Sequence, residues 1–208
     1  MKVLIADDHQ IVRQGLRMLL ERERFTVVAE AVDGREAVRL AIDLRPDVAI
    51  LDLTMPLLNG LEAAREVLRE RGGTRVILLT MHAEEHQVAI ALRAGVRGYV
   101  LKTQAAEDLT HAIRAVVAGQ TYLSPAISSL VVDAYVSGER PAADPLAPRE
   151  RQVLQLVAEG KTSKEIAAIM GLSVKTAESY RTRLMEKLEI HQTAGLVRYA
   201  IRNGIVDP

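Results

Sequence analysis

Short apolar runs alternate with amphipathic stretches over the first 118 residues, and this rhythm constrains the fold more than any other feature. The apolar runs are Val3–Ala6, Thr26–Ala29, Val48–Leu51, Val76–Leu79 and Gly98–Leu101. Most are series of Val, Ile and Leu, as is typical of strands buried on both faces. The segments of helical periodicity are Gln10–Arg22, Gly34–Leu44, Asn59–Arg71, Glu84–Ala94 and Ala106–Ala118. The alternation predicts an α/β domain of (βα)5 type, with helices covering a five-stranded parallel sheet.

The rest of the chain follows a different pattern. Ser124-Pro125 opens a possible helix through Val136, and the stretch SGERPAADPLAP that follows has the composition of a linker. Beyond it only helical patterns occur, over 148–158, 163–170, 174–188 and 193–202. We therefore predict an α/β domain at 1–123, a connector of helix and flexible linker at 124–145, and a small all-α four-helix domain at 146–208.

Composition and charge exclude several classes of protein. The 208 residues include no Cys, which excludes a disulfide scaffold and Cys-ligated zinc. No apolar run approaches the roughly 20 residues of a membrane-spanning helix, and the N-terminus does not resemble a signal peptide, so we expect a cytoplasmic protein without a membrane partner. The formal net charge is zero, but residues 146–208 carry 10 Lys and Arg against 7 Asp and Glu. This excess is a weak sign of nucleic-acid binding.

Polar residues stand where the predicted strands end. Asp7 and Asp8 follow the first strand, Asp52 the third, Thr80 the fourth and Lys102 the fifth. The carboxyl ends of parallel strands meet at one edge, where ligands bind. Three neighbouring carboxylates cannot all ionise cheaply, and Mg²⁺ resolves that conflict. Together with an ammonium and a hydroxyl, such a site suits a phosphoryl group, and a carboxylate can itself be the nucleophile.

These residues, with DLTMPLLNG starting at Asp52 and with Tyr99, resemble the receiver domain of two-component response regulators over residues 1 to about 120. The resemblance implies a flavodoxin-like fold with Asp52 as the phosphoacceptor. It implies that Asp8, Asp52 and the backbone carbonyl of Thr54 bind Mg²⁺, with Asp7 helping through water.

Three further residues take roles from the same resemblance. Lys102 would pair with the acyl phosphate, Thr80 would move toward it, and Tyr99 would turn inward. One departure is Thr103, which stands where many receivers carry Pro after the Lys.

The C-terminal helices contain a helix-turn-helix candidate. A short helix over Ser163–Met170 is followed by Gly171 and by a longer helix from Val174 to Leu188. On the longer helix we expect a buried face formed by Val174, Ala177, Tyr180, Leu184 and Leu188. By itself, this pattern favours an ordinary amphipathic helix with a solvated polar face over a recognition helix.

The exposed face would enter the major groove of DNA. Our base-edge candidates are Lys175, Glu178, Ser179 and Thr182, because their side chains donate to or accept from base edges. Better placed for phosphates are Lys161, Thr162, Lys164, Thr176, Arg181, Arg183 and Lys187.

The motifs from Pro148-Arg149-Glu150 through Lys164-Glu165-Ile166-Ala167 to Ser173-Val174-Lys175-Thr176 resemble the LuxR-type DNA-binding domain. With the receiver, the chain resembles the NarL/FixJ class. The resemblance implies a transcription factor, not an enzyme, that a sensor histidine kinase phosphorylates on Asp52. Its other partners would be double-stranded DNA and, when phosphorylated, a second copy in a homodimer. Helix 193–202 could form the dimer seam or simply pack in the core.

Two other functions fit parts of the sequence. The receiver could act as a dimerisation module in a regulator that needs no phosphorylation. A Mg²⁺-dependent phosphatase with an aspartate nucleophile usually has a second Asp two residues later, where this chain has Thr54.

Overall fold

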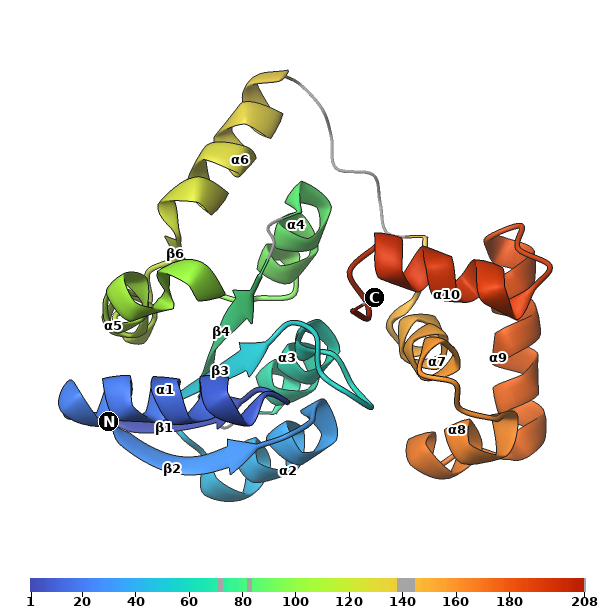
Figure 1. Cartoon of the computed structure of the whole chain (residues 1–208), viewed down its shortest axis with the longest axis horizontal. Helices are drawn as coiled ribbons and strands as arrows, with labels where there is room; N and C mark the ends of the chain where they lie inside the picture. Colours follow the sequence, from blue (N-terminus) through green and yellow to red (C-terminus); the bar gives the residue numbers. More distant parts are fainter. Residues whose placement is uncertain (71–72, 82–83, 138–144, 208) are drawn as a thin grey trace.

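The computed structural model describes residues 1–70, 73–81, 84–137 and 145–207, which form an N-terminal α/β lobe and a C-terminal helical lobe (Figure 1). The sheet of the first lobe is parallel throughout, in the order β2-β1-β3-β4-β5-β6. Its strands are β1 (Lys2–Ala6), β2 (Thr26–Ala31), β3 (Val48–Asp52), β4 (Arg75–Thr80), β5 (Gly98–Leu101) and β6 (Tyr122–Leu123). The prediction of five strands was wrong by one: β6 pairs with β5 at the edge and is too short to form an apolar run.

Helices cover both faces of this sheet, as the pattern predicted. They are α1 (Gln10–Arg22), α2 (Gly34–Leu44), α3 (Gly60–Arg69), α4 (Glu85–Arg93) and α5 (Ala105–Val117). Helices α2, α3 and α4 pack with alternate strand residues such as Leu4, Leu51 and Leu78. Helices α1 and α5 pack with the residues between them, such as Ile5 and Ile50. Strand β3 is buried along its whole length, so Asp52 ends a strand that is almost completely shielded from solvent.

The C-terminal lobe has a core of its own. Its helices are α7 (Pro148–Ala158), α8 (Ser163–Met170), α9 (Val174–Lys187) and α10 (Thr193–Arg202). Ala177 and Leu184 are buried as expected, but Val174 is 44% exposed, so its predicted place on the buried face was wrong. As the first residue of α9, it lies beyond the surface that α7 and α8 cover. On α10, Leu196 and Ala200 are fully buried in this core.

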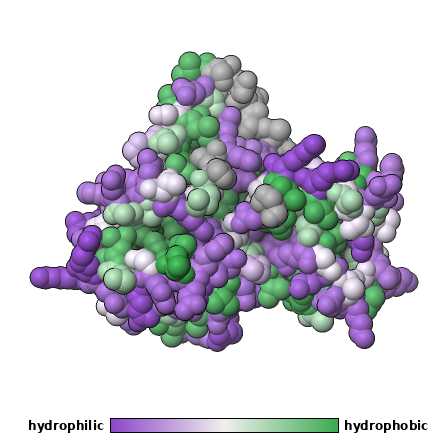
Figure 2. All heavy atoms as spheres, in the orientation of Figure 1, coloured by the Kyte–Doolittle hydropathy of each residue, from purple (hydrophilic) through white to green (hydrophobic). Residues whose placement is uncertain are grey.

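Helix α6 (Pro125–Ser137) occupies the predicted connector and extends away from the α/β lobe beside α4 (Figure 1). Ile127 and Ala134 are buried, whereas Val132 and Val136 are exposed. Figure 2 shows hydrophobic atoms at the top of the molecule, where α6 lies in the same view in Figure 1. The flexible linker predicted after it falls mainly on 138–144, outside the described residues. None of the described helices is long and apolar enough to cross a membrane.

Gly60 lets α3 start directly against the end of β3. A Cβ at this position would collide with the carbonyl oxygen of Asp52, which is backbone and cannot move aside. We expect Gly60→Ala to lower the free energy of unfolding by about 1–3 kcal/mol, as overpacking does. Gly15, inside α1, has nothing within 4 Å of the same position. Gly15→Ala should therefore raise stability by about 0.5–1 kcal/mol, and chemical denaturation of both variants tests the difference.

Candidate functional site

The carboxyl ends of β1, β3 and β5 bring three predicted residues into direct contact. The Nζ atom of Lys102 lies 2.8 Å from Oδ2 of Asp7 and 2.8 Å from Oδ2 of Asp52. The side chains of Asp7 and Asp52 are 0% and 1% exposed, and that of Lys102 is 10% exposed. One ammonium thus bridges two buried carboxylates that are 45 positions apart in the chain.

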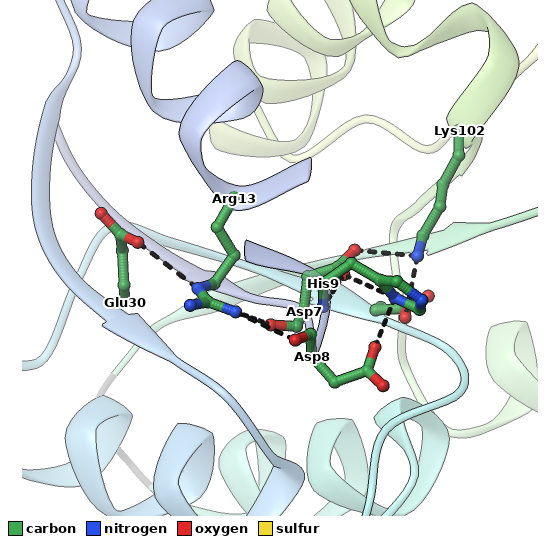
Figure 3. A network of polar contacts seen from close by, with 7 residues as sticks. Asp7, Asp8, His9, Arg13, Glu30 and Lys102 are labelled. Atoms are coloured by element: carbon green, nitrogen blue, oxygen red, sulfur yellow. Dashed lines mark hydrogen bonds and ion pairs between the residues drawn. The ribbon is translucent and has the colours of Figure 1, made fainter. Parts of the chain in front are cut away.

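Asp8 lies next to this bridge, with His9 beside it (Figure 3). Its side chain is 34% exposed, and its Oδ1 atom is 2.7 Å from Nδ1 of His9. The backbone N–H of His9 donates to Oδ1 of Asp7 at 2.9 Å. The two adjacent acids therefore differ in environment, because Asp7 belongs to the buried bridge and Asp8 to the rim.

Arg13 also belongs to the site, although the sequence analysis gave it no role. From α1, its Nη1 donates to the backbone carbonyls of Asp7 and Asp8, at 2.8 and 3.2 Å (Figure 3). Its Nε lies 3.4 Å from Oε2 of Glu30 on β2. The sequence signal for this contact is a basic residue in the first turn of the predicted helix, five positions after Asp8. The guanidinium fastens the end of β1 to α1 and β2.

Burial controls the electrostatics of the site. Desolvation raises the pKa of Asp52 to about 7, although the charge of Lys102 opposes this shift. Burial also works against the ammonium of Lys102, but its interactions with Asp52 and Asp7 raise its pKa overall. At neutral pH Asp52 is thus close to the boundary between a neutral acid and a nucleophilic carboxylate.

The donor set suits a hard divalent cation. Asp7, Asp8, His9 and Asp52 each offer a ligand atom, and these atoms all lie within 4.8 Å of one another. Three of the four are carboxylates, the oxygen ligands that Mg²⁺ prefers. Thr54, whose carbonyl the resemblance adds, lines the same cavity as Asp8. The residues therefore fit the predicted cation.

Thr80 and Tyr99 lie next to the bridge on β4 and β5. Thr80 is 6% exposed and lines a cavity of about 520 Å³ with Lys102 and Thr54. The ring of Tyr99 is already fully buried, and burial raises its pKa well above the usual range. The peptide bond before Thr103 is trans, and Lys102 reaches both carboxylates without the Pro found in many receivers.

Capping residues define where the two helices of the helix-turn-helix begin and where the first one ends. The hydroxyl of Thr162 and the carboxylate of Glu165 cap each other's backbone at the start of α8. Gly171 ends α8 in the left-handed conformation, and the Ser173 hydroxyl accepts a hydrogen bond from the N–H of Thr176 to begin α9. The predicted DNA-contacting residues that are exposed on α9 are Lys175, Thr176, Glu178, Ser179, Thr182, Arg183 and Lys187.

Two of the lysines predicted to contact phosphates have other neighbours. Lys187 forms an ion pair with Glu150 on α7, with an N–O distance of 2.7 Å. Lys161 is half-buried and lines the cavity that contains Asp8, so it faces the other lobe. Lys164 is exposed at the start of α8. A role in DNA binding remains a prediction for all three.

Two segments of the chain match known protein families. Residues 3–114 match the response regulator receiver domain, and residues 144–200 match the bacterial regulatory proteins of the luxR family. The chain belongs to the response regulators. It is a two-component response regulator of the NarL/FixJ class, with a receiver and a LuxR-type DNA-binding domain that regulates transcription.

Sequence similarity to known response regulators covers the full length of this chain. The chain is 38% identical to the oxygen regulatory protein NreC of Staphylococcus carnosus, over 100% of both chains. It is 37% identical to the transcriptional regulatory protein LiaR of Bacillus subtilis, over 99% of both. RcsB of Salmonella enterica serovar Typhimurium, solved on promoter rprA with the phosphomimetic BeF3⁻, is 31% identical with a TM-score of 0.67, covering 96% of this chain and 97% of that one.

The pKa of Asp52 leads to a pH-dependent prediction. Between pH 3.8 and about 7 the folded chain keeps a proton that the unfolded chain releases, so stability falls as pH rises through this window. Asn cannot titrate. In metal-free buffer we expect Asp52→Asn to raise the free energy of unfolding by roughly 2–4 kcal/mol above pH 7, and by little near pH 4.

Denaturant unfolding across this pH range measures the gain. Asp43, whose side chain is 59% exposed, provides the matched control, and Asp43→Asn should leave the pH profile unchanged. A gain in Asp52→Asn that is the same at pH 4 and pH 8 would contradict the assignment.

Proposed function

We propose that this response regulator is switched by phosphorylation of Asp52, which a sensor histidine kinase carries out in a Mg²⁺-dependent reaction. The observation that carries the proposal is the buried Asp52 carboxylate, held 2.8 Å from Lys102 beside two further acids. An ammonium and a cluster of oxygen ligands around one carboxylate suit a phosphoryl group, which spreads negative charge over three oxygens.

The chain's own residues have distinct tasks in this transfer. A carboxylate oxygen of Asp52 forms a bond to phosphorus while the bond from phosphorus to the histidine nitrogen of the kinase breaks, and that nitrogen keeps the electron pair. Lys102 already contacts Asp52 and would pair with the incoming phosphoryl oxygens. Asp8, Asp52 and the carbonyl of Thr54 would hold Mg²⁺, with Asp7 acting through water. The bound cation would neutralise charge on the phosphoryl oxygens.

The output is DNA binding by the C-terminal lobe. Lys175, Glu178, Ser179 and Thr182 would meet base edges, and the basic residues nearby would meet phosphates. Thr80 and Tyr99 would carry the change from the phosphorylated site to the receiver surface. Phosphorylated copies would pair as homodimers on adjacent half-sites, and the protein would act in the cytoplasm.

The test of Asp52 uses a small phosphodonor. With acetyl phosphate and Mg²⁺, the wild-type chain should take up phosphate and shift toward a dimer, whereas Asp52→Ala should do neither. Mass spectrometry and analytical ultracentrifugation measure the two effects. Asp43→Ala removes an exposed carboxylate and should behave as wild type. Phosphate uptake by Asp52→Ala at the wild-type level would move the phosphoacceptor to another residue.

The DNA contacts can be tested by their dependence on salt and sequence. Lys175→Ala should cost about 1–3 kcal/mol on a specific site and relax the preference at one base pair. Arg183→Ala should weaken binding to all duplexes alike and reduce the salt slope by about 1. Arg39→Ala, at an exposed side chain on α2 of the receiver, is the control and should change neither quantity. Fluorescence anisotropy at several salt concentrations measures both, and an unchanged slope in Arg183→Ala would exclude that phosphate contact.

A further inference from the structure

Helix α7 of the DNA-binding lobe binds the backbone of the loop that follows the phosphoacceptor. Gln155 is fully buried; its Nε2 donates to the carbonyl of Met55 and its Oε1 accepts from the N–H of Asn59, both at 2.8 Å. Oε1 of Glu159 accepts from the N–H of Leu57 at 3.0 Å. Three backbone groups within seven residues of Asp52 are thus satisfied by side chains of the other lobe.

Leu57 shows that the loop is adapted to this contact. Its φ is +66°, a left-handed conformation that Gly or Asn adopts at lower cost than Leu. Its side chain packs against the apolar core of the C-terminal lobe. The cost of the left-handed conformation of Leu57 is therefore offset by burial of its side chain against the C-terminal lobe.

The C-terminal residues after α10 lie over the phosphorylation site itself. The cavity of about 520 Å³ at Thr80 and Lys102 has Ile201, Gly204, Val206 and Asp207 in its wall. A second cavity, of about 340 Å³, joins Asp8 and Thr54 to Glu159, Lys161 and Ile205–Asp207. The Nε2 atom of Gln87 on α4 donates to the carbonyl of Asn203 at 2.8 Å and fastens this segment to the receiver.

The recognition helix lies on the other side of its lobe. Helix α9 is on the side away from the receiver in Figure 1, and its predicted DNA-contacting residues are exposed. The docked face is formed by α7 and by the end of α10 with the residues that follow it. The contact between the lobes therefore covers the phosphorylation site and leaves the DNA-binding face open.

We propose that the DNA-binding lobe is a roof over Asp52, which restricts protein-sized phosphodonors while admitting small ones. This inference rests on the proposed function, since it concerns access to the same carboxylate. A kinase domain must approach Asp52 closely. It therefore competes with α7 and with residues 204–207 for the receiver surface around the acidic site. Small phosphodonors enter through the cavities. The compact form thus controls the input of the switch rather than access to DNA.

The absence of Cys makes the roof measurable with a single introduced thiol. Thr54, which lines both cavities, is replaced in Thr54→Cys, and Met18→Cys places a reference thiol at a side chain that is 73% exposed. Each thiol reacts with N-ethylmaleimide and with the same maleimide attached to a small folded protein. We expect the ratio of the large-reagent rate to the small-reagent rate to be about tenfold lower at position 54 than at position 18. This is the ratio for a protein in which the form with separated lobes makes up about one tenth of the population. Equal ratios at the two positions would overturn the roof.

Two variants should remove the roof without touching the acidic site. Gln155→Ala leaves the Met55 carbonyl and the Asn59 N–H unpaired when the lobes dock, and Gln14→Ala, at an exposed position of α1, is its control. Gly204→Ala adds a Cβ at the place of Nε2 of Gln87, so this side chain must move and lose its hydrogen bond to the carbonyl of Asn203, whereas Gly171→Ala has a similar φ and nothing within 4 Å. In the Thr54→Cys background, both contact variants should raise the rate ratio toward that of Met18→Cys, and both controls should leave it low. A ratio that stays low in both contact variants would contradict the proposal.

A DNA-binding measurement distinguishes this roof from a cover over the recognition helix. Affinity of Gln155→Ala for a non-specific duplex should equal that of Gln14→Ala, because α9 is already exposed. An affinity that rises together with the thiol rate ratio would show that the compact form hides the DNA face, and the inference would fail. The thiol assay needs no phosphate transfer, so its outcome is independent of whether Asp52 is the phosphoacceptor.

Discussion

The bridge from Asp7 through Lys102 to Asp52 is the interaction on which the site depends. Two carboxylates that are almost completely buried share one ammonium, each at 2.8 Å. Such an arrangement persists only if three strand ends are held rigidly, because a separated partner would leave a buried charge unpaired. Three features fix the strand ends in place. The sheet is parallel, α3 begins at Gly60 directly against the end of β3, and Arg13 donates a hydrogen bond to the carbonyl of Asp7 at the end of β1.

The bridge leaves the site with an excess of negative charge. One ammonium faces two buried carboxylates and the partly exposed Asp8, and burial raises the pKa of Asp52 to about 7. A charge imbalance of this kind lowers stability and favours a bound cation. The charge imbalance that makes the folded receiver less stable suits the proposed role of Asp52, because a Mg²⁺ ion held by the acidic cluster would neutralise it.

The loop from Met55 to Asn59 connects this chemistry to the other lobe. It follows β3, which ends in Asp52, and includes Leu57 in a left-handed conformation. Its backbone groups form hydrogen bonds with the side chains of Gln155 and Glu159. Rearrangement of the loop around an occupied site would alter the surface on which α7 rests. Conversely, docking of α7 favours one arrangement of the loop, since linkage between two such equilibria is reciprocal.

The sequence by itself determined the (βα)5 pattern, the helix-turn-helix and the residues of the acidic rim, because hydrophobic periodicity and strand-end position are local properties. The predicted bounds of α7 and α8, 148–158 and 163–170, also agree with the structure, because helical periodicity is a local property too. The sequence analysis missed β6, which has only two residues, and it placed Val174 on a buried face because periodicity does not show where the neighbouring helices end. Only the tertiary structure decided that Arg13 fastens the acidic strand end and that α7 and the C-terminal residues face Asp52 while α9 faces outward. Those arrangements depend on which surfaces of separate elements meet in space, and no spacing along the chain encodes that.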